Sequence, residues 1–322
     1  MFVLTEKENI IAQFTQDVIA GLSMTPKRLP SKYFYDAKGD GLFRDIMACK
    51  DYYVTRCEME IFTEQTEKIA RAISTGRGEF DLIELGPGDC SKSKHLLQAL
   101  LNNGVRFNYV PIDISYDVIQ GIESNLPGDL PGIQISSRHG DYHQMLKALS
   151  SGSDSRKVIL NLGANVGNMP SEQCYKFIGD LRNSLSKGDI VLMGFDLVKD
   201  PKIIRAAYDD DEGITREFNL NLLRRMSNEL EADLDISKFE HYCSYDPVTG
   251  ACKSYLVAVG DTSIDIGAER FKLSRYESIW TEISQKYTLA QIEDIALANA
   301  FQPINLFTDS REWFADVLWE AK

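Results

Sequence analysis

The chain lacks any apolar run of about 18 or more residues, the length that a membrane-spanning helix needs. Its first residues, Met1 to Glu8, also lack the basic start and apolar centre of a secretory signal peptide. Lysine and arginine form no stripe, and the net charge of -13 disfavours contact with a phosphate backbone. We therefore predict a cytoplasmic protein with no nucleic-acid partner and no membrane partner.

Patterns typical of metal sites and disulfide frameworks are missing as well. The 6 cysteines are scattered without a C-x-x-C pair, and the 4 histidines are dispersed along the chain. We predict reduced cysteines that pack in the interior, and no metal site. With 322 residues, 43% of them hydrophobic, the chain is long enough for one large core or two domains.

A nucleotide-binding pattern lies between residues 81 and 113. The apolar segment Asp81 to Leu85 runs into Gly86-Pro87-Gly88, and a second apolar segment ends in Asp113. Two glycines let the backbone turn sharply and approach a ligand, and an acid that ends the next strand accepts hydrogen bonds from ribose hydroxyls. The pattern predicts a βαβ unit that binds an adenosine-containing cofactor through Gly86, Gly88 and Asp113.

Ser91, three residues after Gly88, narrows the choice of cofactor. Ser91 occupies the position of the third glycine in a dinucleotide fingerprint, which disfavours an NAD-dependent oxidoreductase. The pattern resembles instead that of class I S-adenosylmethionine methyltransferases. Lys92 then suits either the cofactor carboxylate or a solvated helix position, and Asp141-Tyr142 suits either the adenine amino group or a helix N-cap.

Apolar runs alternate with helical segments after residue 80. The expected strands are 80–85, 107–112, 133–136, 157–162 and 189–195, and the expected helices between them are 91–101, 116–124, 142–149 and 171–185. Such alternation predicts a parallel, doubly wound α/β sheet with its ligand at the carboxyl ends of the strands.

The alternation stops after Leu197. Helical patterns are present at 6–22, 57–74, 202–208 and 215–231, and residues 239–259 read as a β-hairpin. A helix at 289–300 and a last strand at 315–319 restore the earlier rhythm. We predict a Rossmann-like cofactor domain of residues 57–198 plus 286–322, and an α+β substrate domain of residues 1–56 plus 199–285.

Several polar groups outside the cofactor pattern suit a small polar ligand. Gly163 and Asn168 flank a turn after the fourth predicted strand, where a pocket edge and a simple turn would use the same residue types. Alternation over 281–287 places Glu282 and Ser284 on one strand face, as a solvated edge strand would also do. Tyrosines at 35, 52 and 208 fit a pocket or ordinary half-buried packing.

A series of motifs, in order from about residue 25 to the C-terminus, resembles the histidine-specific Nα-methyltransferases of ergothioneine biosynthesis. The motifs are Lys32-Tyr33-Phe34-Tyr35-Asp36, Tyr52-Tyr53-Val54-Thr55-Arg56-Cys57-Glu58, Glu84-Leu85-Gly86-Pro87-Gly88, Gly167-Asn168, Asp196-Leu197-Val198-Lys199-Asp200, Ala207-Tyr208-Asp209-Asp210, Glu217-Phe218-Asn219 and Thr281-Glu282-Ile283-Ser284-Gln285-Lys286-Tyr287. The resemblance implies transfer of up to three methyl groups from S-adenosylmethionine to the α-amino nitrogen of histidine, which gives hercynine.

The resemblance also implies residue roles. It assigns Gly86, Lys92, Asp113, Asp141 and Tyr142 to S-adenosylmethionine, Asn168 and Tyr208 to the amino and carboxylate end of histidine, and Tyr52, Glu282 and Ser284 to its imidazole. We also expect Gly88 to contact the cofactor and Gly163 to contact the substrate. Tyr35 would border the amine and the sulfonium, so that Asn168 and Tyr35 act by positioning, without a nucleophile.

One departure from the family pattern keeps other acceptors open. Ser254 stands where the family commonly has a methionine beside the imidazole, and a smaller, more polar wall changes ring selectivity or admits water. Another amino acid or amine is therefore an alternative acceptor, and a non-catalytic module that binds the cofactor is a further alternative. The sequence does not reveal the oligomeric state and is compatible with a monomer.

Overall fold

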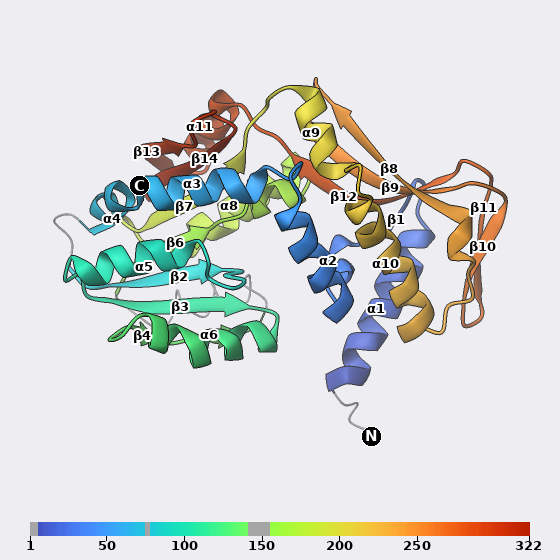
Figure 1. Cartoon of the computed structure of the whole chain (residues 1–322), viewed down its shortest axis with the longest axis horizontal. Coiled ribbons are helices and arrows are strands. Elements are labelled where there is room, and N and C mark those ends of the chain that lie inside the picture. Colours follow the sequence, from blue (N-terminus) through green and yellow to red (C-terminus); the bar gives the residue numbers. More distant parts are fainter. Residues whose placement is uncertain (1–5, 75–77, 141–154) are drawn as a thin grey trace. The chain divides into compact units, whose positions relative to one another are not determined.

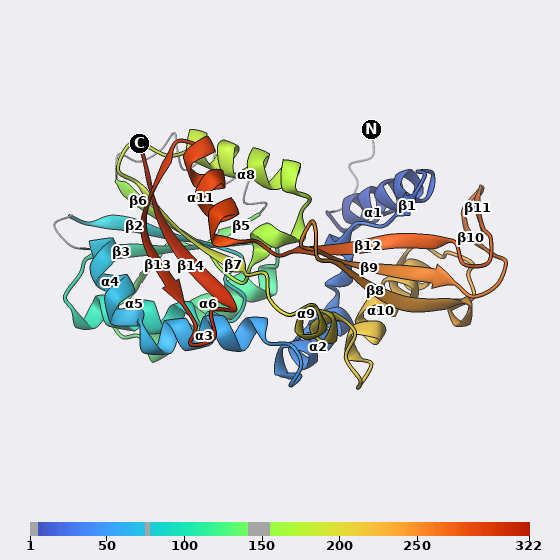
Figure 2. The same cartoon turned by 90° about the horizontal axis from the view of Figure 1, so that it is seen from above.

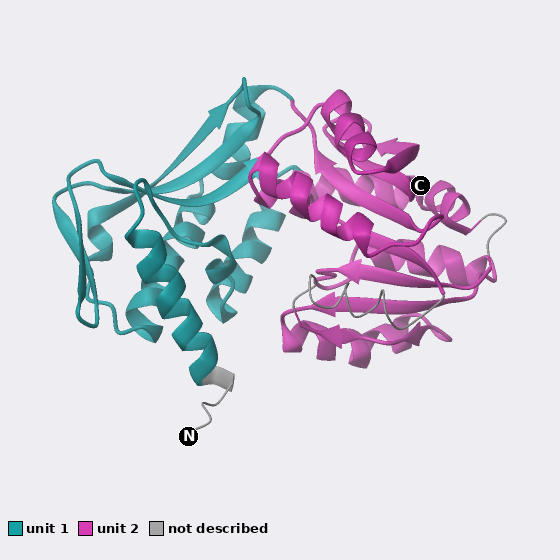
Figure 3. Ribbon diagram, turned by 180° about the vertical axis from the view of Figure 1, so that it is seen from behind, with its two compact units in different colours: residues 1–53, 199–284 teal, residues 54–198, 285–322 magenta. Residues whose placement is uncertain are grey.

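The computed structural model describes residues 6–74, 78–140 and 155–322. These residues form two compact units: unit 1 is Met1–Tyr53 with Lys199–Ser284, and unit 2 is Val54–Val198 with Gln285–Lys322 (Figure 3). Both units are discontinuous in sequence, because the chain leaves unit 2 after Val198 and returns at Gln285. The predicted helix at 142–149 and the candidates Asp141 and Tyr142 lie outside the described residues.

Unit 2 is built on an eight-stranded sheet in which β13, β14, β7, β6, β2, β3 and β4 lie in that order and β5 also pairs with β3 (Figure 1). Its strands are β2 (Phe80–Leu85), β3 (Phe107–Asp113), β4 (Gln134–Ile135), β5 (Arg138–His139), β6 (Arg156–Asn161), β7 (Ile190–Asp196), β13 (Phe301–Thr308) and β14 (Phe314–Ala321). The parallel α/β core confirms the predicted fold class.

The last two strands depart from the parallel prediction. β14 runs antiparallel to β7, and β13 runs antiparallel to β14. The connection between β13 and β14 is too short for a crossover helix, so the two strands can only form an antiparallel pair. The sheet is therefore mixed, with an antiparallel edge.

Helices cover both faces of this sheet (Figure 2). The helices of unit 2 are α3 (Val54–Glu64), α4 (Thr66–Ser74), α5 (Ser93–Asn102), α6 (Tyr116–Asp129), α8 (Ser171–Asn183) and α11 (Leu289–Ala298), with the 3-10 turn η2 (Asn165–Asn168). α8 and α11 bury Phe177, Ile178 and Ile292 against Ile83 and Val110 of the sheet. α3, α4, α5 and α6 lie on the opposite face.

The single helix predicted over 57–74 is wrong. α3 ends at Glu64, and the amides of Lys68 and Ile69 bond back to the Gln65 carbonyl, which begins α4. The Gln65 side chain donates to the Thr308 carbonyl at 2.8 Å. Apolar residues occur on both sides of the break at helical spacing, so periodicity alone did not reveal it.

Unit 1 is an α+β unit with a four-stranded sheet of order β1, β12, β9, β8 and a separate β10–β11 hairpin. Its elements are α1 (Glu6–Leu22), β1 (Lys27–Arg28), η1 (Ser31–Phe34), α2 (Ala37–Ala48), α9 (Pro201–Tyr208), α10 (Ile214–Glu229), η3 (Ile236–Lys238), β8 (Phe239–Asp246), β9 (Ala251–Ala258), β10 (Thr262–Ile266), β11 (Glu269–Leu273) and β12 (Ser278–Gln285). The predicted 239–259 hairpin is confirmed as β8 and β9. The β10–β11 hairpin was not predicted.

The core of unit 1 is separate from that of unit 2. Phe14, Phe34, Phe218, Leu222 and Leu256 belong to one buried cluster of unit 1. Gly39 is required at the start of α2, because a Cβ there would lie 1.8 Å from the Phe34 carbonyl oxygen.

Among the described residues, no helix is both long and apolar enough to cross a membrane.

Candidate active site

The glycine loop after β2 exposes its backbone at the carboxyl end of the parallel strands. Gly86 and Gly88 are exposed and have φ angles of 65° and 56°, a left-handed conformation that glycine adopts without strain. Asp113 is the last residue of β3, half-buried, and its Oδ1 accepts from the Ser115 amide at 2.8 Å. The loop and the strand-end carboxylate fit an adenosine ligand with a ribose diol.

Lys92 contacts a buried carboxylate that sequence reasoning had given no role. Glu58 on α3 is 0% exposed and forms an ion pair with the Lys92 ammonium. Its other carboxylate oxygen, Oε1, accepts from the Gly163 amide at 2.7 Å. Glu58 therefore anchors the Lys92 ammonium at the start of α5, and 21% of the Lys92 side chain stays exposed.

Glu84 is the acid of the Glu-Leu-Gly-Pro-Gly motif and lies beneath the loop. It is 3% exposed, and its Oε2 accepts from the Tyr109 hydroxyl at 2.5 Å. Burial raises the pKa of Glu84 to about 7, against the hydrogen bonds from Tyr109 and Ser93, which lower it. The carboxyl that begins the glycine loop therefore titrates near neutral pH.

The loop after β6 holds Gly163 and Asn168, the two other candidates among the described residues of unit 2. Gly163 has a φ of 75°, and Asn168 ends η2 as an exposed residue. A Cβ on Gly86 would lie 3.7 Å from Nδ2 of the Asn165 side chain, so the loops after β2 and β6 are neighbours. Unit 2 thus brings together Gly86, Gly88, Lys92, Asp113, Gly163 and Asn168 at one end of its sheet.

Unit 1 brings the other candidates together. The Tyr208 hydroxyl at the end of α9 lies 2.7 Å from the Ser284 hydroxyl on β12, and both residues are buried. The Tyr52 and Tyr208 rings meet edge to face at 6.0 Å. Glu282 is half-buried, two positions before Ser284 on β12. This arrangement offers hydroxyl groups and a carboxylate from one strand and one helix end.

Tyr35 lies beside aromatic rings of the same unit. Its ring is 5.6 Å from Phe43 and 5.7 Å from Phe218, with both pairs edge to face. Burial, followed by the Glu282 charge, raises the pKa of the Tyr35 phenol, although 42% of the residue is exposed. Tyr35 therefore stays a neutral hydrogen-bonding group near the Glu282 carboxylate.

Ser254, the departure from the family pattern, is a buried member of β9. Its hydroxyl lies 3.3 Å from His241 Nε2, and its carbonyl accepts from the Thr281 hydroxyl at 3.0 Å. Burial lowers the pKa of His241 to about 4, so its imidazole is neutral at physiological pH. The small Ser254 side chain is thus hydrogen-bonded to an imidazole of the protein itself.

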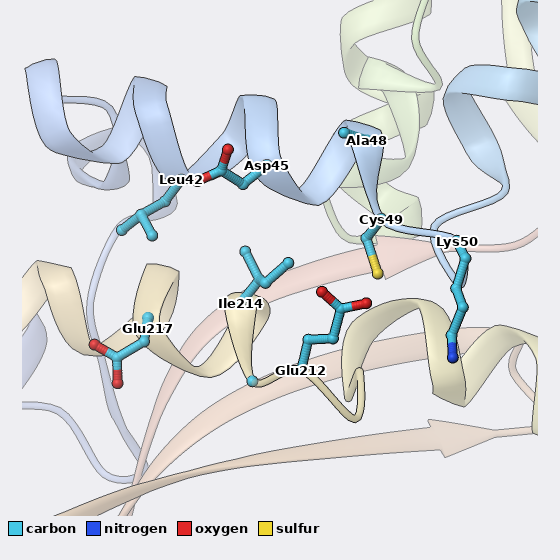
Figure 4. Close-up of a pocket in the computed structure, with 9 residues that line it drawn as sticks. Leu42, Asp45, Ala48, Cys49, Lys50, Glu212, Ile214 and Glu217 are labelled. Atoms are coloured by element: carbon cyan, nitrogen blue, oxygen red, sulfur yellow. The ribbon is translucent and has the colours of Figure 1, made fainter.

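A groove of about 600 Å³ in unit 1 contains none of these candidates (Figure 4). It lies between the end of α2 and the start of α10, and its polar lining includes Asp45, Lys50, Glu212 and Glu217. The groove is broad and open to solvent, and the α10 amides of Ile214 and Thr215 are already bonded to Asp210. The chemistry of the candidate site therefore does not lie in this groove.

Comparisons with known proteins identify the family. Residues 14–321 match the model of a family described as histidine-specific methyltransferase, SAM-dependent. Histidine N-alpha-methyltransferase of Mycobacterium tuberculosis is 32% identical over 91% of this chain and 90% of its own length, and that of Mycolicibacterium smegmatis is 33% identical over 84% of both chains.

A more distant relative is named for a different substrate. The 4-dimethylallyltryptophan N-methyltransferase easF of Claviceps fusiformis is 27% identical over 59% of this chain and 56% of its own length. The family model covers almost the whole chain, including the segments of unit 1 that a generic cofactor domain lacks. The chain belongs to the histidine-specific, S-adenosylmethionine-dependent methyltransferase family.

Proposed function

We propose that this protein transfers methyl groups from S-adenosylmethionine to the α-amino nitrogen of L-histidine, up to the trimethylated product hercynine. The observation that carries the proposal is the contact of the Tyr208 hydroxyl, at the end of α9, with the Ser284 hydroxyl of β12, the strand that also holds Glu282, in a chain of this family. A carboxylate on that strand suits an imidazole N–H, and hydroxyl groups suit the polar end of an amino acid.

On the donor side, unit 2 supplies the groups for the cofactor. Gly86 and Gly88 would allow the backbone to approach it, Asp113 would accept from its ribose hydroxyls, and Lys92 would meet its carboxylate. S-adenosylmethionine supplies an electrophilic methyl group on a sulfonium. Asp141 and Tyr142, proposed for the adenine, complete this set.

On the acceptor side, the protein has to hold an uncharged amine in line with the sulfur–methyl bond. Asn168, Gly163 and Tyr208 would fix the amino and carboxylate end, whereas Tyr52, Glu282 and Ser284 would select the imidazole. Tyr35 would border the amine as a neutral phenol. Exclusion of water near a positive sulfonium disfavours the protonated ammonium, which releases its proton to solvent and becomes the neutral amine.

A second acceptor class is favoured by one contact. The Ser254 hydroxyl is hydrogen-bonded to His241, so the side of the proposed ring pocket formed by Ser254 is more polar than the methionine that the family commonly has there. An amino acid with a different aromatic ring is therefore the second candidate acceptor, in keeping with the name of the Claviceps relative, a 4-dimethylallyltryptophan N-methyltransferase. The protein would act in the cytoplasm, where the thiols of its six buried cysteines stay reduced.

A substrate panel tests the proposal. The protein is incubated with S-adenosylmethionine and, separately, with histidine, tryptophan, tyrosine and histamine, and products are detected by mass. We expect one to three added methyl groups on histidine and the highest kcat/KM for it. Preferred methylation of another amino acid would favour the second candidate, and cofactor binding without any turnover would indicate a non-catalytic module.

A further inference from the structure

A buried carboxylate in unit 2 links the two loops that the proposed function needs. Glu58 lies on α3, and its two oxygens contact the Lys92 ammonium and the Gly163 amide. Lys92 begins the helix after the glycine loop, and Gly163 begins the loop after β6. One side chain therefore bridges the loop after β2 and the loop after β6.

The surroundings of Glu58 are shaped to receive it. A Cβ on Gly194 of β7 would lie 2.7 Å from Glu58 Oε1, so only glycine leaves room for the carboxylate there. Asp316 of β14 pairs with Gly194 in the sheet and is 0% exposed. Neither Asp316 oxygen has a hydrogen-bond partner among the described residues.

The charges in this cluster favour a single ion pair. Burial and the Glu58 charge raise the pKa of Asp316 well above its usual range, which favours its protonated form. The Lys92 ammonium then contacts the Glu58 carboxylate and also interacts with the charge of Glu84. An ion pair removed from water is a poor source of stability, whereas it is well suited to holding two groups in one geometry.

We propose that Glu58 is a positioning residue for methyl transfer: it fixes the Lys92 ammonium and the Gly163 amide relative to each other, and so aligns the cofactor loop with the acceptor loop. The proposal rests on the proposed function and adds a residue that does not itself touch either substrate. Because methyl transfer is sensitive to the alignment of the reacting groups, loss of this bridge lowers the kcat of the folded protein in addition to any loss of stability.

Two substitutions break the bridge in different ways. Glu58→Gln keeps an acceptor for the Gly163 amide and removes the charge that Lys92 needs, and Glu58→Asp keeps the charge with a side chain too short to reach both groups. We expect each variant to lower kcat with both substrates saturating by about 30-fold or more. Glu58→Gln should also weaken cofactor binding more than Glu58→Asp does, because it releases Lys92.

A matched control separates positioning from folding. Asp189 is also a buried carboxylate, but it accepts from the Lys157 and Ser186 amides at the opposite end of β6. Asp189→Asn should lower Tm without changing the kcat of the folded protein. If the Glu58 variants behave as this control does, with lowered Tm and kcat within about twofold of wild type, Glu58 is structural only and the inference is wrong.

A measurement on the wild-type protein covers the case in which both variants fail to fold. With ¹⁵N-labelled glycine, the Gly163 amide should exchange its hydrogen slowly, and its resonance should shift when S-adenosylmethionine binds. Exchange as fast as in an unfolded peptide would contradict the bridge. A wild-type protein that methylates no histidine would instead count against the proposed function.

Discussion

The two units differ in the kind of polar group that they bury. Among the described residues, every buried charged side chain lies in unit 2, including Glu58, Glu84 and Asp316, whereas the buried polar residues of unit 1 are neutral: Thr215, Asn219, Asn221, Ser254, Thr281 and Ser284. Buried charges hold geometry at a cost in desolvation, and neutral hydroxyls and amides discriminate by shape and hydrogen bonding. The interior of unit 2 thus holds charged groups in fixed positions, whereas the interior of unit 1 is lined by neutral hydrogen-bonding groups.

The largest expected effect concerns the pH dependence of stability through Glu84. The folded pKa of Glu84, about 7, lies above the ordinary glutamate value of 4.5, so its contribution to stability is present below pH 4.5 and is lost as pH rises through about 7. This group alone lowers the free energy of unfolding by about 3 kcal/mol across that window. Urea unfolding of wild type and Glu84→Gln at pH 5 and pH 7.5 should show a flatter dependence for the variant, and identical slopes would contradict the assignment.

His241 in unit 1 provides the opposite sign. Its folded pKa of about 4 lies below 6.5, so its contribution is present above pH 6.5 and is lost as pH falls through about 4. His241→Gln keeps a hydrogen-bonding group for Ser254 and should reduce the loss of stability between pH 6.5 and pH 4, by an amount of the same order as for Glu84. A variant that loses stability on acidification as steeply as wild type would show that His241 is not buried as a neutral imidazole.

Glu282→Ala tests the acceptor side. Loss of a hydrogen bond to a charged group costs about 2 kcal/mol, so the histidine KM should rise about 30-fold while the cofactor Kd stays unchanged. Steady-state kinetics and calorimetry give the two numbers. Glu240→Ala, an exposed acid on β8, is the control and should change neither. If the variant lost cofactor affinity and kept its histidine turnover, Glu282 would belong to the cofactor site, and its assignment to the acceptor would be wrong.

Asp113→Ala tests the donor side with a smaller expected effect. Ribose hydroxyls are also solvated by water, so we expect S-adenosylmethionine to bind about 10-fold more weakly, in calorimetry without any acceptor. Asp81→Ala is the matched control, because Asp81 accepts from Asn108 at 3.0 Å at the other end of β2. Equal cofactor affinity in wild type and Asp113→Ala would exclude the ribose role.

The sequence predicted the parts of the site that depend on local pattern. Asp113 ends its strand because an apolar run stops there, and the 239–259 hairpin follows from alternation around a Pro/Gly turn. The β10–β11 hairpin has a similar pattern of alternating apolar residues around Gly267, although it is not among the predicted elements. The alternating residues are Ile264, Ile266, Phe271 and Leu273.

The bridge through Glu58 has no local signal at all. Its partners Lys92 and Gly163 are 34 and 105 residues away in the chain, so no spacing in the sequence indicates that they meet. The antiparallel edge of the sheet was missed for a related reason, since strand direction follows from connection length and pairing partner, and residue pattern alone does not specify it. Long-range polar contacts are thus the part that required the structure.

The proposed methylation of the α-amino nitrogen of histidine is tested most directly by locating the transferred methyl group in the product. Histidine is incubated with the protein and S-adenosylmethionine that carries a ¹³C-labelled methyl group, and the product is examined by NMR and tandem mass spectrometry. We predict labelled methyl groups on the α-amino nitrogen and none on the imidazole. Label on a ring nitrogen, or on another amino acid in preference to histidine, would contradict it.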